Sequence, residues 1–139
     1  MEQPDGSIWI SHDKGVSKCV VDIGVPLVVE TLHMVPFRRF EVDVKKDAVE
    51  VIRDIFDKLR TDTSPALIQG DFNMNGDSLA EFLPKLFQNG LQEIKLSRPT
   101  TPKGRNYDRI LSRGLKPIKT MVIDSALTDH YPVYAEFEI

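Results

Sequence analysis

The stretch Ala66-Leu67-Ile68-Gln69-Gly70-Asp71-Phe72-Asn73 decides the fold that this sequence predicts. Its first five residues are typical of a short buried strand, and Gly70 allows the backbone to turn sharply after it. Asp71 and Asn73 then project from the following loop. An Asx-turn would also explain these two residues, but the loop at the end of a buried strand is where α/β folds place catalytic groups.

Two Val-rich runs precede this strand, at residues 16–23 and 25–33, with Gly24 between them. They predict a hairpin or two adjacent strands, and their continuous apolar character favours burial on both faces. Residues 7–11 predict one more short strand. Cys19 lies in the first run, and we expect a buried structural thiol because one cysteine cannot form a disulfide within the chain.

Two helices are expected, one before and one after the central strand in the sequence. Apolar residues at three- and four-residue spacings predict an amphipathic helix within residues 43–60. Ser78 and Glu81 predict a capping box for a second helix over 79–89. Pro84 lies inside that helix, so we expect it to be short or kinked.

The remaining chain predicts a loop over 97–106 and strands near 107–112, 117–124 and 132–138. The last strand alternates apolar and polar residues, which is typical of a half-buried strand. Strands, helix, strand, helix and strands in this order indicate an α/β fold with an α+β mixed sheet. The length of 139 residues predicts one domain with its own core.

Further chemically active residues lie at other strand ends. His33 ends the second Val-rich run, Asp108 begins the 107–112 strand, and Asp129 and His130 precede the last strand. A single histidine at such a place is commonly structural, and an Asp-His pair can be a plain turn. The alternative is an acid–base pair, because a carboxylate fixes the tautomer of an imidazole and raises its basicity.

In this order, the clusters resemble the motifs of the endonuclease/exonuclease/phosphatase superfamily, whose members are metal-dependent phosphoester hydrolases. The most specific motifs are Gly-Asp-Phe-Asn at 70–73 and Thr-Asp-His-Tyr-Pro-Val at 128–133. Thr-Leu-His at 31–33 and Tyr-Asp-Arg-Ile-Leu at 107–111 complete the set. The resemblance extends over residues 7–139.

The resemblance implies a set of catalytic residues, which are His33, Asp71, Asn73, Asp108, Asp129 and His130. His130 would activate water or bind the scissile phosphate, with Asp129 orienting it or ligating a metal. Asp71 would position the water. His33 and Asn73 would donate hydrogen bonds to phosphate oxygens as negative charge develops, and Asp108 would support these groups.

The resemblance also implies Mg²⁺ or Mn²⁺, held by Asp71, Asn73 and Asp129, because hard oxygen ligands suit these ions. The Asn and Glu motifs of the superfamily's N-terminal half have no counterpart here. We therefore expect a single truncated domain over 1–139. It could be a fragment of a larger or split enzyme, a remnant without turnover, or a compact variant with substitute ligands. Such ligands could come from a second copy or from Asp13, Asp22, Glu30 or Asp77.

The complete fold of the superfamily is a four-layer α/β sandwich. The resemblance implies half of it, one mixed sheet with helices packed on one face, and such a half would expose an apolar sheet face. We therefore expect a homodimer, or a partner chain that covers this face. No apolar run approaches the roughly 20 residues that span a bilayer, and the first residues do not resemble a secretion signal. With a single cysteine, these features predict an intracellular protein of the cytoplasm or nucleus.

The net charge of −3 means that any nucleic-acid binding requires a local basic patch. Residues 95–119 are rich in Lys and Arg, and could form such a patch or a solvated loop. The candidate substrate-binding residues are Arg38, Arg98, Lys103 and Arg105. The leading hypothesis is a Mg²⁺-dependent phosphodiester hydrolase, a nuclease acting on DNA or RNA. The alternative is a catalytically incomplete module of the same fold that binds nucleic acid or a protein partner.

Overall fold

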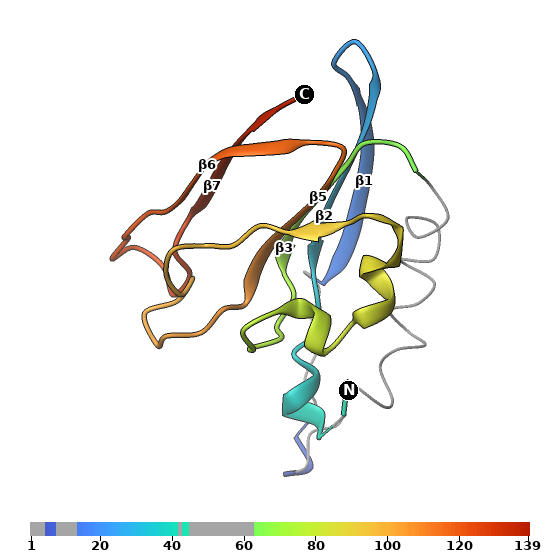
Figure 1. The fold of residues 1–139 in the computed structure, drawn as a ribbon. Helices are drawn as coiled ribbons and strands as arrows, with labels where there is room; N and C mark the ends of the chain where they lie inside the picture. The colour runs from blue at the N-terminus through green and yellow to red at the C-terminus, as the bar shows by residue number, and fades with distance from the viewer. Residues whose placement is uncertain (1–4, 8–13, 42, 45–62) are drawn as a thin grey trace.

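The computed structural model describes residues 5–7, 14–41, 43–44 and 63–139. A five-stranded sheet of order β1-β2-β3-β5-β4 is its main element (Figure 1). Only β2 and β3 run parallel, and the other neighbouring strands are antiparallel, so the predicted mixed sheet is confirmed. The strands are β1 (Gly15–Asp22), β2 (Pro26–His33), β3 (Ala66–Asp71), β4 (Gln92–Glu93) and β5 (Asp108–Arg113).

The two Val-rich runs form the predicted hairpin of β1 and β2. Gly24 forms its turn with a φ of 91°, and its N–H donates to Asp22 Oδ1 at 2.9 Å. Burial on both faces was a wrong expectation for β1, because this strand forms an edge of the sheet and every residue in it is exposed. Cys19 is therefore an exposed thiol rather than a buried one.

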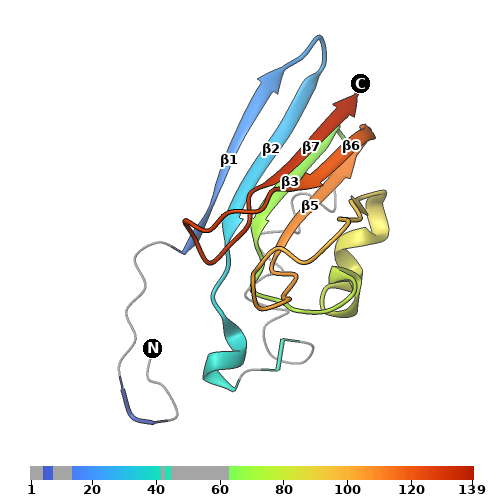
Figure 2. The same cartoon turned by 90° about the vertical axis from the view of Figure 1, so that its left-hand side faces the viewer.

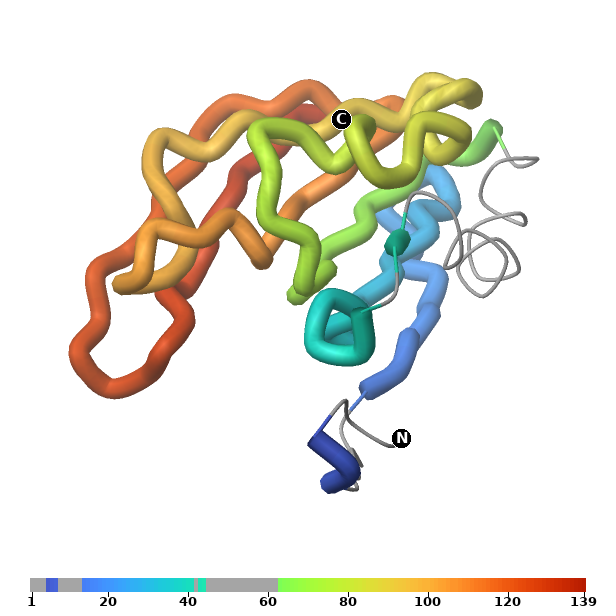
Figure 3. The backbone as a smooth tube through the Cα atoms, turned by 90° about the horizontal axis from the view of Figure 1, so that it is seen from below, coloured from blue at the N-terminus to red at the C-terminus, as the bar shows by residue number. Residues whose placement is uncertain are grey.

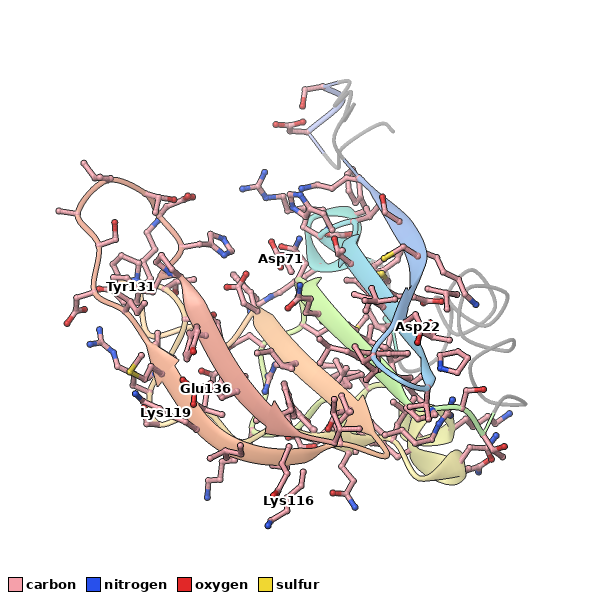
Figure 4. The ribbon with its side chains drawn as sticks, turned by 90° about the horizontal axis from the view of Figure 1, so that it is seen from above. Asp22, Asp71, Lys116, Lys119, Tyr131 and Glu136 are labelled. Carbon is pink, nitrogen blue, oxygen red and sulfur yellow. The ribbon has the colours of Figure 1, made fainter. Side chains whose placement is uncertain are left out.

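A second, two-stranded sheet pairs β6 (Lys116–Val122) with β7 (Val133–Glu138). This hairpin lies on the β5 side of the main sheet, opposite β1, in Figure 1. In Figure 2, which is seen from that side, β7 lies in front of the main sheet. Val133, Ala135 and Phe137 are half-buried and the residues between them are exposed, so the predicted half-buried strand is confirmed. Seen from above, the strands follow one another in a curved layer (Figure 4).

The helices of the described residues are short 3₁₀ helices. The predicted capping box is confirmed: the Ser78 side chain accepts from Ala80 N, and Glu81 accepts from Ser78 N. A single helix over 79–89 was a wrong expectation, because Pro84 lacks an N–H and starts a new helix. The helices are η1 (Phe37–Phe40), η2 (Leu79–Glu81) and η3 (Pro84–Asn89).

The expected strand over 7–11 and helix over 43–60 fall almost entirely outside the described residues. The expected packing of helices on one face of the sheet depended largely on the helix over 43–60. Among the described residues, no helix is long and apolar enough to cross a membrane.

The core lies between the sheet and the segment that contains η2 and η3. Ile68 of β3, Leu111 of β5 and Leu79 of η2 are fully buried in it. Phe72, which follows Asp71 directly, is also fully buried. Burial of such a ring contributes about 2–3 kcal/mol, so it holds the start of the loop after β3 in place. Figure 3 shows this loop beside η1, at the end of the sheet where the loops before β5 and β7 also lie.

Candidate active site

His33, Asp71 and Asp108 form one row across three strands. The register pairs His33 of β2 with Asp71 of β3, and pairs Asp71 with Asp108 of β5. Residues opposite each other on neighbouring strands point to the same side of a sheet. Two strands end and the third begins at this row, so three polar side chains meet at one end of the sheet, around the Asp71 labelled in Figure 4.

Gly70 makes the close approach of β2 and β3 at this row possible. Its φ is 141°, and a Cβ atom at this position would lie 1.9 Å from the carbonyl oxygen of Leu32. Any side chain here would push the two strands apart, directly before Asp71. The predicted sharp turn directly after Gly70 is wrong, because the strand continues through Asp71. The glycine is instead required by the contact between two backbones.

Asp71 is the centre of the site. Its Oδ2 atom lies 3.3 Å from His33 Nε2, 3.2 Å from Asn73 Nδ2 and 3.9 Å from His130 Nε2. Its Oδ1 atom accepts from the backbone N–H of Asn73 at 2.7 Å. The Asx-turn is therefore present, and it brings the Asn73 amide to the carboxylate rather than competing with a site.

Asn73 is fixed by its backbone as well as by its side chain. Its φ of 54° lies in the left-handed region, where Asn is enriched. Its Nδ2 group also donates to Met34 O at 2.8 Å. Both amide hydrogens have acceptors, and no described residue donates to the Oδ1 atom, which remains an acceptor for a ligand.

His130 is oriented by Asp108. Their Nδ1 and Oδ2 atoms lie 2.8 Å apart, and the Tyr107 ring stacks on the imidazole at a centroid distance of 6.2 Å. The resemblance assigned the orienting role to Asp129 and a supporting role to Asp108. The geometry instead gives the imidazole contact to Asp108, and Asp129 lines the same cleft. The hydrogen bond of His130 thus favours the other alternative for Asp129, which is to ligate a metal, and that role stays a prediction.

The pKa of Asp71 is raised above its ordinary value. Burial is the main cause, because it disfavours the charged carboxylate, and the neighbouring Asp108 raises the pKa further. The backbone N–H of Asn73 and the two imidazoles of His130 and His33 act in the opposite direction. A carboxylate perturbed in this way at the bottom of a cleft is typical of functional sites.

The cleft above these residues has a volume of about 1120 Å³. Arg38, Lys103 and Arg105, which the sequence indicated as substrate-binding residues, all line it. Arg39, which the sequence places next to Arg38 just after the His33 strand end, lines it too. Lys14 also lines it, and sequence reasoning missed this residue. Only the register of β1 on β2, which pairs Gly15 with His33, brings Lys14 against the His33 ring, so no local signal could have revealed it.

Arg98 does not line this cleft. Its guanidinium group is paired with Asp124, with Nη1 and Oδ2 2.7 Å apart, and it lies 4.7 Å from the centroid of the Tyr131 ring. Arg109 and Arg113 are buried inside the fold. The basic residues of 95–119 therefore point in several directions and do not form one continuous patch.

No family model matches the chain. The UPF0294 protein of Vibrio cholerae is 31% identical over 120 residues, which cover 84% of this chain and 41% of that protein. A UPF0294 protein of Yersinia pseudotuberculosis is 30% identical over 115 residues, which cover 81% of this chain and 43% of that protein. The chain thus spans about two fifths of the length of the curated relatives that it matches.

Solved structures share the fold at lower identity. An endonuclease/exonuclease/phosphatase family protein from Leptotrichia buccalis matches with a TM-score of 0.65 at 18% identity, over 89% of this chain and 54% of that protein. Humanized D. rerio TDP2 matches with a TM-score of 0.67 at 15% identity, over 89% of this chain and 60% of that protein. A mannosyl-6-phosphatase of Bacteroides thetaiotaomicron matches with a TM-score of 0.58 at 19% identity, over 85% and 53%.

The chain has the endonuclease/exonuclease/phosphatase fold. The resemblance read from the four motifs is confirmed at the level of the fold. The chain covers little more than half of each of these structures, so it corresponds to one part of the endonuclease/exonuclease/phosphatase fold.

Within this endonuclease/exonuclease/phosphatase fold, a buried ion pair holds the loop that follows Asn73. Arg109 Nη1 lies 2.7 Å from Glu93 Oε1, and Arg109 Nη2 donates to Gly76 O at 2.7 Å. Glu93 Oε2 accepts from Ser78 Oγ at 2.9 Å and from Leu79 N at 2.7 Å. The pair therefore ties the loop after β3 to β5, the strand that carries Asp108.

The described residues offer oxygen donors of the kind that a hard cation takes. Asp71 and Asp108 are neighbouring carboxylates, and Asn73 Oδ1 is an available oxygen, so the donors suit a hard cation. Within the described ranges, however, no three Asp, Glu, His or Cys side chains surround one point closely enough to hold an ion. Further ligands would have to be waters or groups outside these ranges.

The substitute ligands considered from the sequence lie elsewhere. Asp22 is at the far end of β1 from Asp71 (Figure 4). Glu30 is buried in β2 and pairs with Lys18 at 3.6 Å. Asp77 does not line the cleft, and Asp13 lies outside the described residues.

Proposed function

We propose that this chain carries the proton-transfer and phosphate-binding part of a Mg²⁺- or Mn²⁺-dependent phosphodiester hydrolase that cleaves DNA or RNA. The observation that carries the proposal is the row of His33, Asp71 and Asp108, with His130 held against Asp108 at the base of a large cleft. This arrangement offers a base, a carboxylate and hydrogen-bond donors on one side of a single space.

The imidazole of His130 is the proposed base. Because Nδ1 faces the Asp108 carboxylate, Nδ1 carries the proton. Nε2, which lies 3.9 Å from Asp71 Oδ2, keeps its lone pair for a water molecule that both groups contact. Nε2 takes a proton from water as the water oxygen bonds to phosphorus and the bond from phosphorus to the leaving oxygen breaks. The leaving oxygen keeps the electron pair of the broken bond and takes a proton from solvent. Nε2 then gives its proton to solvent, which restores the base. Positioned proton transfer of this kind contributes about 10²–10⁴ in rate.

Asp71, His33 and Asn73 have supporting parts in the proposed reaction. Asp71 accepts a hydrogen bond from the attacking water, and this directs a lone pair of the water oxygen at phosphorus. His33 donates to the phosphate oxygens, where negative charge develops. A cation held by Asp71, by the free Asn73 Oδ1 and by water molecules would polarise these oxygens.

The cations of the cleft favour a polyanionic substrate. Lys14, Arg38 and Arg39 come from the segments around β1 and η1, whereas Lys103 and Arg105 come from the loop before β5. A single phosphoester needs only one of these two groups of cations, whereas a nucleic-acid strand presents successive phosphates to both groups. Since the net charge is −3, attraction of a polyanion depends on this local arrangement.

The alternative function is a binding module without turnover. It is favoured by one observation, which is that the described residues do not complete a metal cluster. Such a module would bind nucleic acid through the same cations and would leave the phosphodiester bonds intact.

One experiment separates the two functions. The 139-residue chain is incubated with labelled duplex DNA and single-stranded RNA, with Mg²⁺ or with EDTA, beside His130→Ala and Asp71→Asn. Asp22→Asn is the matched control, because Asp22 lies at the far end of β1. Hydrolysis is expected for the wild type and the control with Mg²⁺ only. Binding without cleavage supports the module, and cleavage that survives both active-site substitutions refutes the assignment.

We also propose that a second copy of the chain covers β1. The large apolar side chains of this edge and its turn, Val16, Val20, Val21 and Val25, are all exposed. Such side chains gathered along one edge strand favour association. Sedimentation velocity at micromolar concentration is expected to show a dimer, and Val20→Glu to show a monomer. A wild-type chain that sediments only as a monomer refutes this proposal.

A further inference from the structure

Thr100 connects the two backbones that carry the acid–base pair. Its side chain is fully buried, and it does not line the cleft. Its Oγ1 atom accepts from the backbone N–H of Asp108 at 3.2 Å, and its carbonyl oxygen accepts from the N–H of Tyr131 at 2.7 Å. One residue is thus bonded to Asp108 and to the residue directly after His130.

We propose that Thr100 is the positioning residue that sets the distance and orientation between Asp108 and His130. Its catalytic consequence rests on the proposed function, whereas the hydrogen bonds that it makes do not. Thr100 acts through the backbone of these residues and does not contact the substrate.

The pair requires such a connection because its members come from different sheets. Asp108 begins β5 of the main sheet, whereas His130 belongs to the loop between β6 and β7. They are 22 residues apart in sequence. The register of the described strands pairs β6 only with β7 and joins neither of them to β5. Two hydrogen bonds of Thr100, one accepted by its side chain and one by its carbonyl oxygen, therefore supply a connection that the strand pairing lacks.

The hydroxyl of Thr100 is fully used. It accepts from Asp108 N and from Tyr107 N, both at 3.2 Å, and donates its own proton to Arg105 O at 3.3 Å. A hydroxyl offers one donor and two acceptor lone pairs, so no capacity remains. Because the group is buried, removal of the oxygen would leave two N–H groups without acceptors in a region that water does not reach.

Thr101 provides a matched comparison in the same loop. It is 6% exposed, against 0% for Thr100. Its Oγ1 atom accepts from Arg105 N at 2.9 Å and lies 3.4 Å from Arg105 O. These bonds stay inside the loop and reach neither Asp108 nor the segment that carries His130. The two residues are alike in type and nearly alike in burial, but they differ in what they connect, and Thr101 also lines the cleft.

The test uses nuclear magnetic resonance on the isotope-labelled 139-residue chain. The wild type is expected to show a scalar coupling across the hydrogen bond from Tyr131 N to the Thr100 carbonyl. It is also expected to show a downfield, exchange-protected Nδ1 proton of His130, which Asp108→Asn removes. Thr100→Val keeps the shape of the side chain without the hydroxyl, and should broaden or remove the His130 signal. Thr100→Ser and Thr101→Val should retain it.

The activity measurements give a second result. Thr100→Val is expected to lower kcat by about tenfold to a hundredfold, because a small displacement of a reacting group is costly, with little change in KM. Thr100→Ser should restore most of kcat. If the wild type cleaves no substrate, the proposed function fails, and the His130 signal still decides the role of Thr100.

Two outcomes overturn the inference. One is an unchanged His130 signal in folded Thr100→Val, or the same loss in Thr101→Val. The other is the absence of the coupling between Tyr131 and Thr100 in the wild type, which decides the matter even where Thr100→Val does not fold.

Discussion

Asp71 and Asp108 lie opposite each other on β3 and β5, and the carboxylate of Asp108 raises the pKa of Asp71. Burial of Asp71 acts in the same direction and is the larger cause. The fold thus places two acids side by side where one would be easier to accommodate. Natural proteins accept such a cost at functional sites.

Replacement of Asp71 by Asn is expected to stabilise the fold at neutral pH while abolishing turnover. A carboxyl with a raised folded-state pKa contributes stability that is present below its unfolded-state pKa and lost as the pH rises through the folded-state pKa. The free energy of unfolding of Asp71→Asn should therefore exceed that of the wild type at pH 7. The difference should disappear below about pH 4. Urea unfolding at both values of pH measures it, and a less stable variant at pH 7 contradicts the prediction.

Asp108→Asn is expected to lower kcat by about 10²-fold or more, because an amide cannot hold the proton on Nδ1 of His130 as a carboxylate does. KM should change little, since the cations of the cleft are untouched. Steady-state kinetics on a labelled oligonucleotide measures both constants. Asp129→Asn serves as the comparison: a larger loss of kcat there would return the orienting role to Asp129.

The ion pairs Glu93–Arg109 and Glu138–Lys116 have nearly the same length, 2.7 and 2.8 Å, but differ in exposure. The side chains of the first pair are 14% and 7% exposed, and those of the second 59% and 77%. Glu93→Ala should cost about 3–5 kcal/mol because it leaves a buried guanidinium without its partner. Glu138→Ala should cost less than about 1 kcal/mol. Similar midpoints of urea unfolding for the two variants would disprove the structural role of Glu93.

Gly70→Ala should prevent the correct pairing of β2 with β3, because its Cβ would overlap with Leu32 O. Gly24→Ala is the control, since Gly24 also has a positive φ but has no atom within 4 Å of the added Cβ. The control should lose about 1–2 kcal/mol from the backbone conformation alone. Circular dichroism and thermal unfolding compare the two, and a folded Gly70→Ala chain as stable as Gly24→Ala would be evidence against the close approach.

The double variant Lys103→Ala/Arg105→Ala should weaken nucleic-acid binding and reduce its salt dependence. Each lost phosphate contact lowers the slope of log K against log salt by about 0.7–0.9. Lys119→Ala on β6, away from Asp71 (Figure 4), is the control and should leave the slope unchanged. Fluorescence anisotropy in EDTA at several salt concentrations gives the slopes. Equal slopes for the double variant and the control would exclude this loop from the binding surface.

Features that depend on only a few adjacent residues could be predicted from the sequence. The Asx-turn at Asp71, the capping box of Ser78 and Glu81 and the alternation of β7 depend on local backbone chemistry, and all are confirmed. The site could be located in the same way, because its residues end or begin strands.

Features that depend on distant partners could not be predicted in this way. Exposure of Cys19 depends on the edge position of β1, which composition does not reveal. Arg109 belongs to the basic stretch 95–119, for which the sequence left a basic patch or a solvated loop open, yet it is buried and pairs with Glu93, 16 residues away. The choice of Asp108 as the partner of His130 likewise depends on how the loops meet.

The alignment of His33, Asp71 and Asp108 has a consequence for how the molecule matures. Side chains alternate between faces, so a slip of one position in either strand pairing would turn one of the three residues to the opposite side. A compact chain whose strands are paired in the wrong register would therefore be inactive. Pairing of β3 with β5 joins segments far apart along the chain, which is slow. The arrangement of the site residues should thus form late in folding, at the same time as the last native strand pairing.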